Sequence, residues 1–349
     1  MDKKIAQTSL QSVQENSIKH AKIAFMLSGQ GAQHSGMGKS LYDNSKASRA
    51  VFDHAETLRP GTIAQCFFRN DDELAITINT QPCLYCVDLA AAEALKEAGI
   101  QADILSGFSL GELAALTFSE AVSFDDGFRI CCTRAELMQK ASETVNAAMV
   151  AVLKLSDDDV TAMCSKFSNV FPVNFNCEGQ VVVSGAADEL EEFKLCVKES
   201  GGRAMPLRVG GGFHSPFMAD ASGEFAKALS AISIKRPQPD LYSNVTAKSY
   251  VSSLATAAGA SNTCKTDDTG TDGYAACVTK LLAKQVCSPV LWRKQVENMI
   301  SAGADTFIEA GPGKTLCGFV SRISDKVRVF NVEDYESLMK TIEGVGQND

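Results

Sequence analysis

The 349-residue sequence lacks the features that would assign it to a membrane or to nucleic acid. No apolar run approaches the roughly 20 residues of a membrane-spanning helix, and residues 1–20 lack the apolar stretch of a signal peptide. Basic residues are in deficit, since 33 Lys and Arg face 42 Asp and Glu. Nucleic-acid binding favours clustered Lys and Arg. We therefore expect a cytoplasmic protein with neither partner, and a polar leader over residues 1–20.

Histidine is scarce, and cysteine forms no dense pattern. Twelve cysteines are scattered along the chain, which is typical of reduced thiols in a cytosolic enzyme. The pair Cys83-x-x-Cys86 lies in a helical stretch rich in Ala and Leu, and no second pair completes a zinc site. We therefore predict packed core thiols, no metal site and no bound cofactor.

Strands and helices alternate along most of the chain. Apolar segments predict strands over 23–27, 103–106, 305–309 and 327–331. Helical spacing predicts helices over 34–58, 80–98, 124–142 and 274–284. Residues 144–212 show the order βαββαβ of a ferredoxin-like module. The fold class predicted is α/β: a large α/β-hydrolase-like domain with a parallel sheet (21–143 and 213–349) and an inserted ferredoxin-like subdomain (144–212). Residues 249–275, rich in Ser, Thr, Ala and Gly, predict a surface loop or a partly disordered insertion.

The segment Gly107-x-Ser109-x-Gly111 stands between a predicted strand and a predicted helix. That context is required of a nucleophile elbow, in which glycines permit a sharp turn around an exposed hydroxyl. The residues alone leave an alternative open, in which Ser109 caps the helix and Glu112 completes a capping box.

A serine nucleophile needs a base and an oxyanion hole. His20 lies in the leader, and His54 in a charged helix. Of the four histidines, His214 alone follows Ser109, after a glycine-rich run, although a structural role remains open to it. The backbone N–H groups of Leu110 and of Gln30, in the first glycine turn, could bind the oxyanion, because functional loops gather at the carboxyl ends of parallel strands.

Nine segments in order, from about residue 22 to 332, identify a family. The sequence resembles the malonyl-CoA:acyl carrier protein transacylases, the acyltransferases of fatty-acid and polyketide synthesis. The segments are SGQGAQHSGMG (28–38), QPCLYCVDLA (81–90), SGFSLGELAAL (106–116), TRAELMQ (133–139), PVNFNCEGQVVVSG (172–185), GFHSPFM (212–218), YSNVTA (242–247), KQVCSPVLW (284–292) and EAGPGKTL (309–316).

The resemblance implies a role for each site residue. Ser109 matches the acyl-bearing serine and His214 its base, while Gln30 and Leu110 supply the oxyanion donors. Gln285 matches a residue whose backbone carbonyl orients the histidine, so that no acidic third member is needed.

Arg134 matches the family's arginine that binds the malonyl carboxylate. An unpaired buried carboxylate is costly, and a guanidinium can pair with it through two parallel hydrogen bonds. From spacing alone, Arg134 would be a solvated charge on a helix. Two aromatic residues would shape the acyl pocket. Phe108 stands where the family usually has histidine, and Phe213 resembles the malonyl-selective pattern.

The reaction implied is ping-pong transfer of malonyl from malonyl-CoA, through a serine ester, to the phosphopantetheine thiol of an acyl carrier protein. The predicted partners are malonyl-CoA and the carrier protein, and the predicted state is a monomer. A basic patch for the acidic carrier would draw on Lys39, Lys140, Arg203 and Arg208. A serine esterase or thioesterase, and a non-catalytic synthase subunit, remain alternatives.

Overall fold

The computed structural model describes residues 21–207, 209, 211–253 and 271–346. The predicted leader, Arg208 and most of the predicted loop at 249–275 lie outside these residues.

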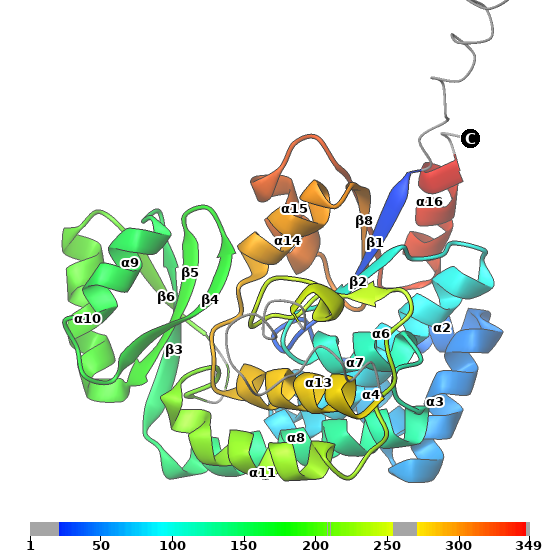
Figure 1. Cartoon of the computed structure of the whole chain (residues 1–349), viewed down its shortest axis with the longest axis horizontal. Coiled ribbons are helices and arrows are strands. Elements are labelled where there is room, and N and C mark those ends of the chain that lie inside the picture. Colours follow the sequence, from blue (N-terminus) through cyan, green and yellow to red (C-terminus); the bar gives the residue numbers. More distant parts are fainter. Residues whose placement is uncertain (1–20, 208, 210, 254–270, 347–349) are drawn as a thin grey trace, which may run out of the picture.

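A five-stranded parallel sheet forms the centre of the larger part (Figure 1). Its strands follow the order β7-β2-β1-β8-β9, and every strand pair is parallel. Their bounds are β1 Lys22–Leu27, β2 Ile104–Gly107, β7 Asp240–Leu241, β8 Ala304–Ala310 and β9 Arg328–Val332. The prediction of a parallel sheet is therefore confirmed.

The side chains of β1 alternate between two hydrophobic cores. Phe25 and Leu27 pack into one core, and Ala24 and Met26 pack into the other. Successive side chains of a strand point to opposite faces, so both faces of this sheet are covered. An all-apolar central strand is what such double burial requires.

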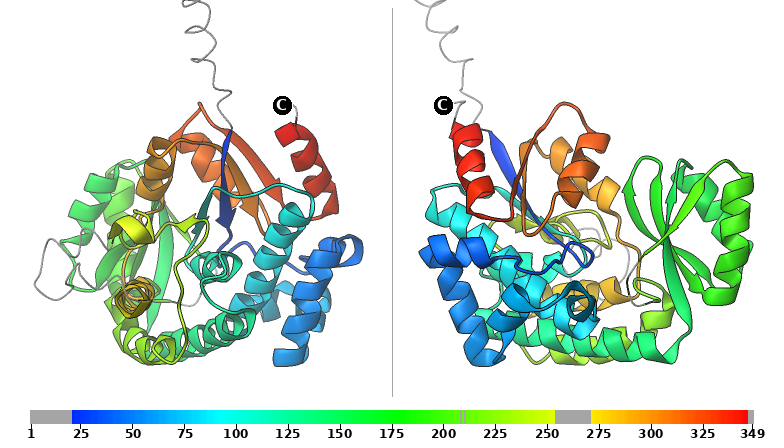
Figure 2. Two further views of the ribbon diagram at one scale, coloured as in Figure 1. Left: turned by 45° about the vertical axis from the view of Figure 1, so that its right-hand side comes forward. Right: turned by 180° about the vertical axis from the view of Figure 1, so that it is seen from behind.

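Helices cover both faces of the parallel sheet (Figure 2). On one side α6 (Thr77–Glu97) and α7 (Gly111–Phe118) contact β1, and α8 (Phe124–Thr144) packs against α6. On the other side α14 (Trp292–Ser301) and α15 (Thr315–Ile323) contact β8. The remaining helices of the larger part are α2 Lys39–Asn44, α3 Lys46–Leu58, α4 Thr62–Phe68, α5 Asp71–Leu74, η1 Pro216–Met218, α11 Ala219–Leu229, α13 Thr271–Val286 and α16 Tyr335–Gly346.

A separate antiparallel sheet forms the smaller part, with α9 and α10 on one face (Figure 1). The elements are β3 Ala147–Leu153, α9 Asp157–Cys164, β4 Val170–Cys177, β5 Gln180–Ala186, α10 Ala187–Glu199 and β6 Arg203–Pro206. This chain order is the predicted βαββαβ, and the strand order is β4-β5-β3-β6. Two backbone hydrogen bonds join β4 to Val290 of the larger part, through the Phe175 N–H (3.0 Å) and the Val173 carbonyl (2.8 Å).

Two element predictions were wrong. The predicted helix 34–58 is divided into α2 and α3, because the Ser45 hydroxyl accepts a hydrogen bond from the Ser48 N–H and starts a new helix there. The predicted loop 249–275 reaches too far, since α13 already begins at Thr271. By contrast, Cys83 and Cys86 lie buried on α6, as expected of core thiols.

Candidate active site

The turn between β2 and α7 places Ser109 in a strained backbone conformation. Ser109 has φ 55°, in the left-handed region that few non-glycine residues adopt. A Cβ on Gly107 would lie 1.9 Å from the carbonyl carbon of Gly111, and a Cβ on Gly111 would lie 2.3 Å from the Leu27 oxygen. Both positions therefore require glycine, and the predicted strand–turn–helix context is present.

The Ser109 hydroxyl contacts a histidine and does not cap the helix. Its Oγ lies 2.7 Å from Nε2 of His214, 105 residues further along the chain. Helix α7 has Leu110 at its N-cap, with no side-chain cap. The capping-box alternative is therefore wrong, and the Glu112 carboxylate is turned into the interior, where it is fully buried.

His214 is oriented by the backbone in the last turn of α13. Its Nδ1 lies 2.8 Å from the carbonyl oxygen of Gln285, so the Nδ1–H tautomer donates there and Nε2 accepts the Ser109 proton. Burial, together with the nearby charge of Arg134, lowers the pKa of His214 to about 4. The ring is therefore neutral near pH 7 and free to accept a proton.

Arg134 extends from α8 to the nucleophile. Its guanidinium is buried, and one Nη2 group donates to Ser109 Oγ at 3.1 Å and to Gln285 Oε1 at 2.9 Å. Nη1 donates to Gln81 Oε1 at 2.9 Å. All of these acceptors are uncharged, and Nε has no hydrogen-bond partner among the described residues. Among the described residues no carboxylate forms an ion pair with this guanidinium, although Glu112 acts on it through its charge from a greater distance. A buried cation without a contacting carboxylate is a site prepared for an anionic ligand.

The predicted oxyanion donors lie on adjacent strand ends. Leu27 at the end of β1 pairs with Gly107 at the end of β2, so the Gln30 turn lies beside the elbow. Within the described part of the chain, the backbone N–H groups of Gln30 and Leu110 donate no hydrogen bond. The Gln30 side chain is held by Thr77 Oγ1 at 3.2 Å. These two free donors make an oxyanion hole possible, and this role stays a prediction.

Sequence reasoning missed the polar side chains that surround the elbow. Asn244 accepts a hydrogen bond from the Ser109 N–H at 2.7 Å and donates to the Gly107 carbonyl at 2.7 Å. For Gln285, the sequence predicted a role for the backbone carbonyl alone. Its side chain also donates, to Ser109 O at 2.8 Å and to Glu112 at 2.8 Å. Asn244 lies in one of the nine family segments, YSNVTA (242–247), but its position in the sequence suggests no role for it.

The two predicted pocket aromatics lie in different cores. Phe108 is half-buried and packs edge-on against Trp292, with ring centroids 5.4 Å apart. Phe213 is buried in the core on the α6 side of the sheet. The selectivity roles of both remain predictions.

The basic-patch prediction is equally open. Lys140 and Arg203 are exposed, whereas Lys39 pairs with Asp43. Arg208 lies outside the described residues.

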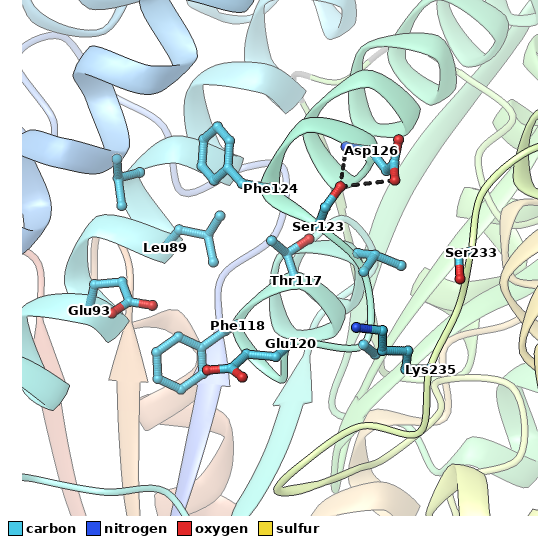
Figure 3. A pocket seen from close by; sticks show the side chains of 13 residues that line it. Leu89, Glu93, Thr117, Phe118, Glu120, Ser123, Phe124, Asp126, Ser233 and Lys235 are labelled. Atoms are coloured by element: carbon cyan, nitrogen blue, oxygen red, sulfur yellow. Dashed lines mark hydrogen bonds between the residues drawn. The ribbon is translucent and has the colours of Figure 1, made fainter.

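One cavity of about 480 Å³ contains none of the predicted site residues (Figure 3). Leu89 and Glu93 of α6, Phe118 at the end of α7, Phe124 of α8 and Lys235 surround it. Over the described ranges there is neither a cluster of three potential metal ligands nor a helix long and apolar enough to cross a membrane.

Comparison with known proteins assigns the family. The acyl transferase domain family matches residues 24–322. A malonyl CoA-acyl carrier protein transacylase of Bacillus subtilis (strain 168) is 34% identical over 93% of this chain and 97% of its own. This chain belongs to that family. The resemblance to the malonyl-CoA:acyl carrier protein transacylases, drawn from nine sequence segments, is thereby confirmed.

Solved structures of the family share the fold. A malonyl CoA-acyl carrier protein transacylase from Clostridium perfringens superimposes with a TM-score of 0.82 at 36% identity, covering 93% of this chain and 97% of that one. A type II PKS acyl-carrier protein in complex with its malonyl-transacylase gives a TM-score of 0.83 at 28% identity, over 93% of this chain and 100% of that chain. Family membership therefore holds for sequence and fold together.

Proposed function

We propose that this protein transfers a malonyl group from malonyl-CoA, through an ester on Ser109, to the phosphopantetheine thiol of an acyl carrier protein. The named relatives and the acyltransferase domain support an acyltransferase in fatty-acid or polyketide synthesis. The site supports the specific chemistry, because it joins a serine, a neutral histidine and a buried guanidinium.

In the first half-reaction, Ser109 Oγ attacks the thioester carbonyl while its proton passes to His214 Nε2. The N–H groups of Gln30 and Leu110 stabilise the oxyanion, and the Gln285 carbonyl stabilises the imidazolium through Nδ1–H. The carbon–sulfur bond breaks, and coenzyme A leaves with the proton from His214.

In the second half-reaction the carrier thiol loses its proton to His214 and attacks the ester on Ser109. The ester bond breaks, and the proton returns from His214 to the Ser109 oxygen. Neither half-reaction needs a bound cofactor, since the thioester itself supplies the leaving group.

One observation carries the choice of malonyl: the Arg134 guanidinium lies 3.1 Å from Ser109 Oγ, is buried, and contacts no carboxylate in the part of the chain that the structure describes. A malonyl group esterified to this oxygen carries its free carboxylate into the same space. An acetyl group would leave the buried cation unpaired. We place the reaction in the cytoplasm, in keeping with the many cysteines of the chain.

The test is a two-step incubation followed by intact-mass measurement. Malonyl-CoA alone should add one malonyl group to the wild type and none to Ser109→Ala. When holo carrier protein is added, the enzyme should lose the malonyl mass and the carrier protein should gain it. Release of free malonate at the same rate without the carrier would indicate a thioesterase, and no adduct would indicate a non-catalytic subunit.

A further inference from the structure

Glu112 lies buried in the first turn of α7, three residues after the nucleophile. Its Oε2 accepts hydrogen bonds from the Asn244 N–H (3.1 Å) and from Gln285 Nε2 (2.8 Å). Its Oε1 accepts one from the Tyr250 hydroxyl. All three partners are donors, and this arrangement matches an ionised carboxylate, which can only accept.

Asn244 connects Glu112 to the backbone of the nucleophile. Its Oδ1 accepts from the Ser109 N–H (2.7 Å), and its Nδ2 donates to the Gly107 carbonyl (2.7 Å) and to Gln295 Oε1 (3.0 Å). The amide group therefore binds the backbone that leads into the strained residue, at the Gly107 carbonyl and at the Ser109 N–H. A backbone at φ 55° persists only where its surroundings hold it.

Gln285 connects Glu112 to the base. Its backbone carbonyl accepts from His214 Nδ1 (2.8 Å), while its side-chain Nε2 donates to the Ser109 carbonyl and to Glu112, both at 2.8 Å. Its Oε1 accepts from Arg134 Nη2 (2.9 Å). The Gln285 side chain thus contacts Ser109, Glu112 and Arg134, the residue predicted to bind the malonyl carboxylate.

We propose that Glu112 is a positioning residue: its ionised carboxylate holds Asn244 and Gln285, and through them fixes the Ser109 hydroxyl at hydrogen-bond distance from His214. This inference rests on the proposed function for its substrate. Loss of the carboxylate would free the Gln285 side chain and the backbone N–H of Asn244, and a misplacement of about 1 Å at a reacting centre can cost roughly 100-fold in rate.

The charge state of Glu112 gives the proposal a distinctive signature. Burial raises the pKa of Glu112 to about 7, although the hydrogen bonds from Tyr250, Gln285 and Asn244 and the charge of Arg134 on α8 all lower it. The titratable groups facing it are Tyr250 and Arg134, with His214 beyond Gln285. Activity should therefore fall as the pH drops through about 7, well above the His214 pKa of about 4.

The first variant is Glu112→Gln, which keeps the size but adds two N–H donors where three donors already meet. We expect kcat to fall roughly 100-fold with the KM for malonyl-CoA changed by less than about threefold. The acid limb near pH 7 should disappear and leave the limb near 4. Glu309→Gln is the matched control, because Glu309 is also buried but accepts its hydrogen bonds from Leu316 and Cys317 of α15, away from the elbow.

The second variant, Tyr250→Phe, decides the matter if Glu112→Gln does not fold. It removes one donor to the carboxylate, so the acid limb should move to higher pH. Tyr85→Phe is its control, since that buried hydroxyl bonds Thr117 at 2.7 Å. Equal rate losses in the Tyr250 and Tyr85 variants, with an unmoved acid limb, would overturn the proposal.

A fluorophosphonate probe separates this proposal from the proposed function. Ser109 Oγ attacks phosphorus, fluoride leaves and His214 takes the proton, so the probe needs the pair but no malonyl group. Glu112→Gln should slow labelling roughly 100-fold. Wild-type labelling without malonyl transfer would contradict the function alone, whereas undiminished labelling of Glu112→Gln would contradict the positioning role.

Discussion

The parallel sheet and the small antiparallel sheet are stabilised in different ways. The interior of the small sheet is a layer of apolar side chains, mainly valines of β3 and β5 packed against α9 and α10. The carboxyl edge of the parallel sheet instead buries charged and polar side chains, among them Arg134, Glu112, His214 and Asn244. Ser109 and His214 also have positive φ there.

The difference shows where the protein accepts strain and costly burial. An isolated buried charge destabilises a fold by several kcal/mol, and each strained residue costs about 1–3 kcal/mol. Both costs are present where Ser109, His214 and the Arg134 guanidinium meet, since two of the five described non-glycine residues with positive φ and a buried guanidinium lie there. Substitutions at that edge should therefore affect catalysis, while equivalent substitutions in the small sheet should affect stability only.

The largest expected effect contrasts two buried serines. Ser109→Ala should lower malonyl transfer at least about 10⁴-fold, because the Ser109 hydroxyl is the hydrogen-bond partner of His214 Nε2 among the described residues. Ser184→Ala in β5 should leave the rate unchanged, since the Ser184 hydroxyl has no partner among the described residues. Steady-state transfer to the carrier protein measures both. A comparable loss of transfer rate in the two variants would contradict the distinction between the two sheets.

Two glycines sharpen the comparison at the backbone. Gly107→Ala should destabilise the fold by more than about 4 kcal/mol, because its Cβ would overlap the Gly111 backbone at 1.9 Å. Gly201→Ala, in the small part, has φ 80° and nothing within 4 Å, so it should cost only about 1–2 kcal/mol. Urea unfolding and soluble yield report both, and a milder effect for Gly107→Ala would refute the packing argument.

The buried histidine makes stability depend on pH. His214 has a pKa of about 4 when folded, below its usual 6.5, so its protonation favours the unfolded chain. Above about pH 6.5 this effect does not lower the free energy of unfolding. As the pH falls from 6.5 toward 4, the free energy of unfolding decreases by about 3 kcal/mol. His214→Gln should therefore lose less stability than the wild type over this window in thermal melts. Parallel pH curves for the two proteins would contradict the burial of a neutral ring.

The smallest effect is expected at Phe108, beside the nucleophile. Phe108→His restores the residue that the family usually carries and removes an aromatic contact with Trp292 worth about 1 kcal/mol. Malonyl transfer should change by less than about tenfold, and stability should fall slightly. A larger loss of rate would place the Phe108 ring against the acyl group, as the sequence predicts.

The regular elements and the pairing of Ser109 with His214 could be predicted from the sequence. A short continuous apolar run reveals β1, the succession of strand and helix patterns reveals the βαββαβ order, and the glycines around Ser109 mark a turn that needs space. Glu112 and Asn244 could not be found, because their hydrogen bond joins positions 132 residues apart. Locally, Glu112 has the spacing of a capping box, and only the tertiary fold turns it inward.

The most direct measurement is the ratio of malonyl to acetyl transfer by the wild type and by Arg134→Ala, from the two acyl-CoAs to one carrier protein. The buried guanidinium beside Ser109 predicts a ratio that collapses by roughly 10²–10³-fold in the variant, with acetyl transfer retained or raised. An equal loss of both transfers would show that Arg134 supports the fold and does not bind the malonyl carboxylate.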